Sequence, residues 1–109
     1  MTIAIFQLNM HNANQANTEL TTQLAESKNP TLALLQEPYL HKGKIQYPQG
    51  CTKFEHHKNP RTAIYVNKTL NFSLLPSLSN QYATTIAGII NNQKVVISSI
   101  YLHLSLIHI

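Results

Sequence analysis

The pattern of apolar and polar positions predicts a buried strand and then a helix at the start of the chain. Residues 3–9 (IAIFQLN) are short, β-branched and aromatic, which is typical of a buried strand. Asn12 with Gln15 three residues later predicts a capping box, and Pro30 ends the helix. Between them, one narrow apolar stripe recurs at helical spacing: Ala13, Ala16, Leu20 and Leu24.

Residues 31–37 (TLALLQE) predict a second strand. Their apolar run is continuous, which favours burial on both faces, as in a sheet that helices cover. A strand, a helix and a strand with a covered sheet are the first half of an α/β sandwich.

The second part of the chain changes character. Residues 41–61 are rich in turn residues and hold five of the eight Lys and Arg residues, together with three histidines. Residues 62–67 and 70–76 then predict the two strands of a hairpin.

A second hairpin is predicted for residues 82–90 and 93–102. They flank Asn91-Asn92, and asparagine tolerates the positive φ that a two-residue turn requires. The predicted fold class is therefore α/β or α+β, with one early helix followed by mostly antiparallel strands.

Composition limits the kinds of partner and the cellular compartment, but it does not identify the function. Charged residues make up 11% of the chain, against roughly 25% in typical soluble domains. The net charge of +4 permits an anionic partner. The single Cys51 excludes an internal disulfide and favours a reducing compartment, and no signal peptide is recognisable, so we expect a nuclear or cytoplasmic protein. Residues 95–109 are too short for a bilayer span of about 20 residues, so we expect no membrane partner.

One of the chain's few carboxylates follows its most apolar strand. There is no Asp, and the four Glu residues are Glu19, Glu26, Glu37 and Glu55. Asn9 and Glu37 both sit where a predicted strand ends, so neighbouring strands would bring them to one rim of the sheet. A carboxylate beside a carboxamide suits Mg²⁺, which usually takes one or two protein carboxylates and completes its shell with water and phosphate. The alternative is that Glu37 caps a strand at the surface.

Four segments together resemble a known family. They are "FQLN", then "LLQEPY" after one helix, then "NPRTAIYV" and "ISSIYL". Over residues 3–102 the chain resembles the endonuclease domain of non-LTR retrotransposons, the apurinic-endonuclease-like branch of the endonuclease/exonuclease/phosphatase superfamily. The resemblance implies a four-layer α/β sandwich that hydrolyses phosphodiester bonds with Mg²⁺.

The same resemblance suggests roles for individual residues. Glu37 would be a metal ligand, and Asn9 would help to order the metal and the scissile phosphate. Tyr101 matches a family tyrosine near the phosphate, which makes Asn9, Glu37 and Tyr101 the candidate catalytic residues. Arg61 matches a recurrent family arginine. Without the family, Tyr101 is equally a half-buried strand tyrosine, and Arg61 a solvated charge.

The chain also departs from the family pattern. The family's general base, its phosphate-flanking Asp and Asn, and its catalytic His lie in the second half of the domain, and this chain has no Asp. His11 stands where some members carry a metal-binding Asp. We therefore expect residues 1–103 to be a partial, N-terminal domain that is inactive alone, and residues 104–109 to be an out-of-family tail.

Two other groups of side chains could bind ligands. The basic segment could contact nucleic-acid phosphates, or it could be an ordinary solvated loop; its cations are Lys42, Lys44, Lys53, Lys58 and Arg61. Zinc is a weak alternative, because the spacing of its possible ligands matches no standard site; they are His41, Cys51, His56 and His57.

The leading hypothesis is the N-terminal portion of a Mg²⁺-dependent endonuclease that nicks target DNA for retrotransposition. Its partners would be DNA and, in the intact protein, a downstream reverse transcriptase domain. One alternative is a fragment that binds nucleic acid without catalysis. Another is a superfamily phosphoesterase that acts on small phosphate esters.

Overall fold

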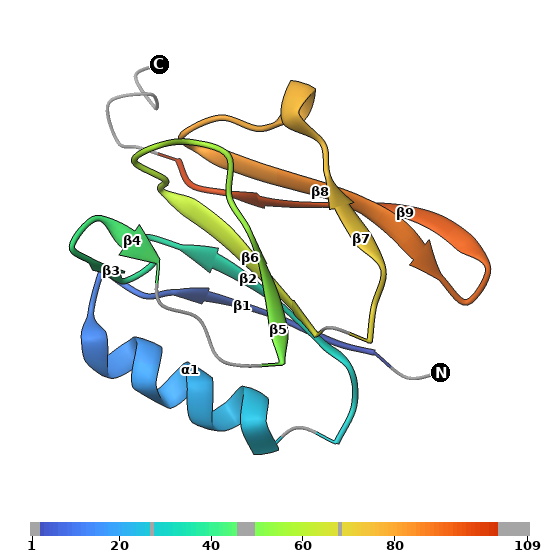
Figure 1. Cartoon of the computed structure of the whole chain (residues 1–109), viewed down its shortest axis with the longest axis horizontal. Helices are drawn as coiled ribbons and strands as arrows, with labels where there is room; N and C mark the ends of the chain where they lie inside the picture. The colour runs from blue at the N-terminus through green and yellow to red at the C-terminus, as the bar shows by residue number, and fades with distance from the viewer. Residues whose placement is uncertain (1–2, 27, 46–49, 68, 103–109) are drawn as a thin grey trace.

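A four-stranded sheet forms the centre of the protein, with a helix on one face and a three-stranded sheet on the other (Figure 1). The structure is a computed structural model that describes residues 3–26, 28–45, 50–67 and 69–102. The elements are β1 (Ala4–Asn9), α1 (Asn14–Glu26), β2 (Thr31–Gln36), β3 (Leu40–His41), β4 (Lys44–Ile45), β5 (Cys51–Phe54), β6 (Thr62–Asn67), β7 (Phe72–Leu74), the 3-10 helix η1 (Pro76–Leu78), β8 (Ala83–Ile90) and β9 (Gln93–Ile100).

The central sheet has the strand order β1-β2-β6-β5. β1 and β2 are parallel, and the remaining pairs are antiparallel, with Leu34 opposite Ile64. β2 is buried along nearly its whole length, so the prediction of a strand covered on both faces is confirmed. The predicted fold class, a mixed α+β fold with mostly antiparallel sheet, is also confirmed.

Two apolar cores lie on opposite faces of this sheet. The helix-side core contains Met10, Leu20, Ala33, Leu35 and Tyr65. The core between the sheets contains Leu32, Ile64, Val66, Phe72 and Ile86. Successive residues of β2 and β6 alternate between the two cores, because side chains in a strand point to opposite faces.

A buried polar layer joins the two sheets at the end of β2. The Thr62 and Thr84 hydroxyl oxygens lie 2.8 Å apart. The Ser99 hydroxyl donates to the Leu35 carbonyl at 2.8 Å, and Gln36 Nε2 donates to the Ser99 oxygen at 3.2 Å. These bonds fix β8 and β9 against β6 and β2 directly beside Glu37.

The predicted second hairpin is confirmed. β8 and β9 pair along their whole length, and the turn residues Asn91 and Asn92 have φ of 50° and 66°. Gly88 of β8 faces Phe72 of β7, and an added Cβ would stand 2.6 Å from the Phe72 ring. Glycine is therefore required for the approach of β7.

The predicted hairpin of residues 62–67 and 70–76 is wrong. β6 pairs with β2 and β5, whereas β7 pairs with β8 in the other sheet. The Asn67 side chain accepts a bond from the Thr69 N–H at 2.9 Å, and its carbonyl accepts one from Leu70, which turns the chain out of the central sheet. Strand periodicity does not identify the pairing partner, and here the core between the sheets selects it.

Two details at the start of the chain also differ from prediction. β1 is an edge strand with alternating exposure, and Ile5 is 52% exposed. Asn12 does not cap the helix; it has φ of 56° and its Oδ1 accepts a bond from the Leu40 N–H at 3.2 Å. The helix begins at Asn14, one residue later than a cap at Asn12 would place it, because this tertiary contact takes the capping oxygen.

Two further expectations concern the C-terminal residues and helices that could span a membrane. The predicted tail, residues 104–109, lies outside the described residues. Among the residues that are described, no helix is both long and apolar enough to span a bilayer.

Candidate functional site

Glu37 is held in an unusual backbone conformation directly after β2. Its φ is 47°, which costs a non-glycine residue about 1–3 kcal/mol. Its N–H donates to the Arg61 carbonyl and its carbonyl accepts from the Asn12 N–H, both at 2.8 Å. These two backbone hydrogen bonds therefore fix the position of the Glu37 backbone, from which the side chain extends. An imposed strain of this kind is common at functional sites.

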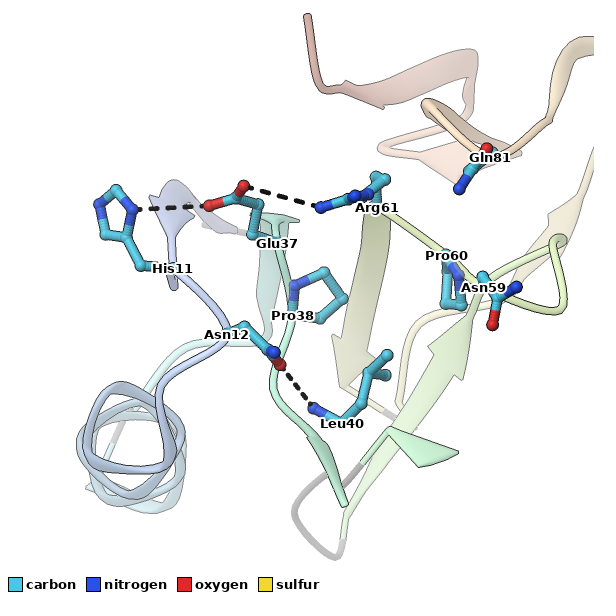
Figure 2. A pocket seen from close by; sticks show the side chains of 9 residues that line it. All are labelled: His11, Asn12, Glu37, Pro38, Leu40, Asn59, Pro60, Arg61 and Gln81. Atoms are coloured by element: carbon cyan, nitrogen blue, oxygen red, sulfur yellow. Dashed lines mark hydrogen bonds and ion pairs between the residues drawn. The ribbon is translucent and has the colours of Figure 1, made fainter. Parts of the chain in front are cut away.

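The Glu37 carboxylate meets cationic and polar groups from three separate segments. Its Oε2 lies 3.5 Å from His11 Nδ1, and its Oε1 lies 3.9 Å from Arg61 Nη1. Figure 2 shows the carboxylate between these two side chains. The Glu37 side chain is 22% exposed, whereas that of His11 is 78% exposed. The carboxylate is therefore largely shielded but still reachable from solvent.

Tyr101 completes this cluster from the end of β9. Its pKa is raised, first by a hydrogen bond to Glu37, then by burial and the Glu37 charge, while Arg61 opposes the shift. The neutral phenol therefore donates to the carboxylate. The Arg61 guanidinium carbon lies 6.0 Å from the Tyr101 ring centre, at the limit of a cation–π contact. The Tyr101 N–H donates to the Tyr82 carbonyl at 2.9 Å, which ties this position to β8.

An open pocket of about 450 Å³ lies in front of Glu37 and Arg61. Its walls come from the loop after β1, the segment after β2 and the loops before β6 and β8 (Figure 2). They consist of His11, Asn12, Glu37, Pro38, Leu40, Asn59, Pro60, Arg61 and Gln81. Its amide, guanidinium and imidazole groups offer hydrogen-bond donors to an anionic ligand, and they stand beside the Glu37 carboxylate and the apolar residues Pro38, Leu40 and Pro60.

The structure gathers three of the four residues suggested by the family resemblance, because Arg61 and Tyr101 both lie against Glu37. Asn9 ends β1 opposite Gln36, at the same edge of the sheet, but it does not line the pocket. Its Oδ1 accepts a bond from the His11 N–H at 2.9 Å, so it shapes the loop that carries His11.

Sequence reasoning missed the contact of His11 with Glu37 and the contributions of Asn59 and Gln81. For His11 a signal existed, because it stands two positions after Asn9. For Gln81 no local signal exists, because its place depends on how the second sheet packs.

The side chains that line the pocket fit Mg²⁺ only if water and substrate oxygens supply most of its ligands. Glu37 is the one carboxylate that lines the pocket. Within the described part of the chain, no three His, Cys, Asp or Glu side chains gather around a possible metal position, so nothing supports the zinc alternative. A single carboxylate is compatible with Mg²⁺, which often keeps several waters and binds substrate phosphate.

The five candidate DNA-binding cations fall into two groups. Lys42 and Lys44 are exposed on the β3–β4 hairpin, which starts at the pocket wall, and Lys58 is exposed beside Asn59. Arg61 lines the pocket itself. Lys53 differs, because its ammonium lies 3.3 Å from the Glu55 carboxylate and its side chain is only 31% exposed.

Comparison with known proteins identifies the fold. No family model and no curated protein sequence matches this chain. Among solved structures, it is similar to the endonuclease domain of TRAS1, a telomere-specific non-LTR retrotransposon, with a TM-score of 0.75 and 22% sequence identity. The match covers 91% of this chain and 44% of that one, so this chain spans less than half of the length of its structural neighbour. The similarity supports an endonuclease-domain fold.

Proposed function

We propose that this chain is the N-terminal portion of a metal-dependent endonuclease domain that nicks DNA. The observation that carries the proposal is the convergence of Glu37, Arg61 and Tyr101. They are separated by 24 and 40 positions, yet they meet beside one polar pocket. The family resemblance selected Glu37 and Tyr101 for the metal and phosphate site, and it matched Arg61 to a recurrent family arginine without a role.

Each residue has a role that follows from its chemistry. The Arg61 guanidinium would bind a phosphate oxygen, because its planar fork matches phosphate geometry. Glu37, supported by Asn9, would hold Mg²⁺, which when bound stabilises negative charge that develops on the phosphate. The Tyr101 phenol orients the Glu37 carboxylate and can turn its proton toward a phosphate oxygen.

The chain does not provide a complete catalytic set. Hydrolysis also needs an activated water and help for the leaving oxygen. His11 is the histidine at the site, but it is 78% exposed and its one carboxylate contact is to Glu37 itself. We therefore propose that the chain alone does not nick DNA, and that a second portion supplies the base.

A plasmid-nicking assay with a chimera tests this function. Residues 1–102 are joined to the part of the TRAS1 endonuclease domain that has no counterpart in this chain. In Mg²⁺, the chimera should convert supercoiled plasmid to the nicked form, whereas this chain alone should not. Glu37→Gln in the chimera should abolish nicking, because the amide cannot hold the ion as the carboxylate does.

Glu19→Gln is the matched control, since it removes an equal charge from the exposed helix surface. It should leave nicking unchanged. Nicking by a folded chimera that survives Glu37→Gln would contradict the role of Glu37. Mg²⁺-dependent nicking by this chain alone would show that its own residues complete the site.

DNA binding without catalysis is the second candidate, and the exposed lysines favour it. Because Lys53 is paired with Glu55, we expect four phosphate contacts, from Lys42, Lys44, Lys58 and Arg61. The logarithm of the DNA affinity should then fall against that of the salt concentration with a slope of about −3.6, at about 0.9 per contact. Affinity that ignores salt would exclude this surface as the DNA contact.

A further inference from the structure

The Ser99 hydroxyl joins the two sheets close to the contact between Glu37 and Tyr101. Ser99 is 1% exposed, and its hydroxyl donates to the Leu35 carbonyl at 2.8 Å. The same oxygen accepts a hydrogen bond from Gln36 Nε2 at 3.2 Å. Ser99 therefore holds β9 against the last two residues of β2, and Glu37 is the next residue of the chain.

Ser99 and Tyr101 lie on one continuous extended segment. The Tyr101 N–H donates to the Tyr82 carbonyl at 2.9 Å, which continues the pairing of β9 with β8 by one residue. Residues two positions apart on a strand face the same side and are about 7 Å apart along it. A bond that fixes Ser99 against β2 therefore also fixes the Tyr101 backbone relative to Glu37.

Gln36 extends this connection to β1. Its Oε1 accepts a hydrogen bond from Gln7 Nε2 at 3.3 Å, while its Nε2 donates to Ser99. Gln36 is only 6% exposed, so removing the Ser99 hydroxyl would take a partner from a buried carboxamide. The three side chains form one network across β1, β2 and β9, at the end of the sheet that carries the candidate site.

We propose that Ser99 is a positioning residue: by tying β9 to the end of β2, it holds the Tyr101 phenol against the Glu37 carboxylate. Tyr101 lies one residue beyond the end of β9, and Ser99 is the last buried residue before it. Glu37 is fixed by its own backbone hydrogen bonds, so Tyr101 is the partner whose place depends on Ser99. The consequence for catalysis rests on the proposed endonuclease function, whereas the positioning itself does not.

NMR spectroscopy of this chain tests the positioning without a nicking assay. Nuclear Overhauser effects between the Tyr101 ring and the Glu37 methylene protons report how close the two side chains are. Ser99→Ala should lose most of this signal, because β9 is then released from the end of β2. Ser98→Ala is the matched control and should keep the signal. The Ser98 hydroxyl lies 2.8 Å from that of Thr85, on the other face of β9.

Gln36→Met provides a second variant, because it removes the carboxamide and keeps a side chain of similar size. It should weaken the same signal, and adding Ser99→Ala should weaken it little further, since the two residues act as one unit. The thermal midpoint of each variant verifies that the fold is kept. A folded Ser99→Ala variant with the signal of the Ser98→Ala control would overturn the proposal. If Ser99→Ala does not fold, an undiminished signal in Gln36→Met overturns it instead.

The nicking chimera measures the consequence for catalysis. Ser99→Ala should lower kcat about tenfold and leave KM unchanged, because a misplaced group slows the reaction while the DNA-binding lysines stay as they are. In a Tyr101→Phe background, Ser99→Ala should lower kcat little further. A second tenfold loss there would show that Ser99 does not act through Tyr101. A chimera that does not nick would contradict the endonuclease proposal alone, because the NMR comparison decides the positioning.

Discussion

The two sheets of this protein have similar strand sequences but very different surroundings. β2 and β6 of the central sheet are buried on both faces, whereas β9 alternates between buried and exposed side chains. Val96 and Ile100 of β9 are 61% and 55% exposed, although Val66 in β6 is only 1% exposed. The comparison teaches that an apolar run reveals a strand but not how many layers cover it. It also predicts that equal substitutions will have unequal effects in the two sheets.

The largest expected difference is between Ile64→Ala and Val96→Ala. Ile64 is completely buried between the sheets, so its truncation should lower the free energy of unfolding by about 2–5 kcal/mol. Val96→Ala, on the exposed face, should change it by less than about 0.5 kcal/mol. Urea denaturation monitored by circular dichroism measures both. Equal losses would mean that the outer face of β9 is covered in solution.

Gly88→Ala should destabilise the second sheet by about 1–3 kcal/mol. The added methyl group would meet the Asn71 carbonyl and the Phe72 ring, each at 2.6 Å, and β7 would have to move away. Ser73→Ala on the exposed side of β7 is the control and should be near neutral in the same denaturation experiment. A neutral Gly88→Ala would show that β7 is loosely attached.

Thr62→Val tests the polar layer that joins the sheets. The substitution removes a buried hydroxyl contact to Thr84 and should cost about 1 kcal/mol. The double variant with Thr84→Val should cost less than the sum of the two single changes, because neither hydroxyl is then left without its partner. Additive costs in this double-mutant cycle would mean that the two hydroxyls are not coupled.

Among these substitutions, Tyr65→Phe in the helix-side core should have the smallest effect on the free energy of unfolding at neutral pH. Burial, and then the charges of Glu55 and Cys51, raise the pKa of Tyr65 well above its ordinary value of 10.0. Because the folded-state pKa is the higher one, this contribution to stability is complete below pH 10 and is lost as the pH rises further. Tyr65→Phe should therefore flatten the loss of stability above pH 10, measured by urea denaturation at each pH. Tyr39→Phe controls for the loss of one tyrosine. An identical alkaline slope in Tyr65→Phe would contradict the prediction.

The candidate site was only partly accessible from the sequence. Glu37 could be selected because a lone carboxylate follows an apolar strand, and Tyr101 and Arg61 because their surrounding segments resemble a family. The positive φ of Glu37 could not be foreseen, because it depends on two backbone hydrogen bonds, one that Glu37 donates to Arg61 and one that it accepts from Asn12. The roles of these residues in catalysis stay predictions until the nicking experiment is done.

The sequence by itself determined the main helix, the strands β1, β2, β6, β7, β8 and β9, and where the tight turn falls, but not β3, β4 and β5, which lie in or beside the segment that is rich in turn residues. These features depend on side-chain period and on the φ preference of residues such as Asn91, which act over a few neighbouring positions. Only the tertiary structure decided that β6 and β7 enter different sheets, that β1 lies at an edge, and that Glu37 meets Arg61 and Tyr101. Those outcomes come from packing between residues far apart in the chain, where many strand pairings satisfy the local pattern and the two buried cores select one.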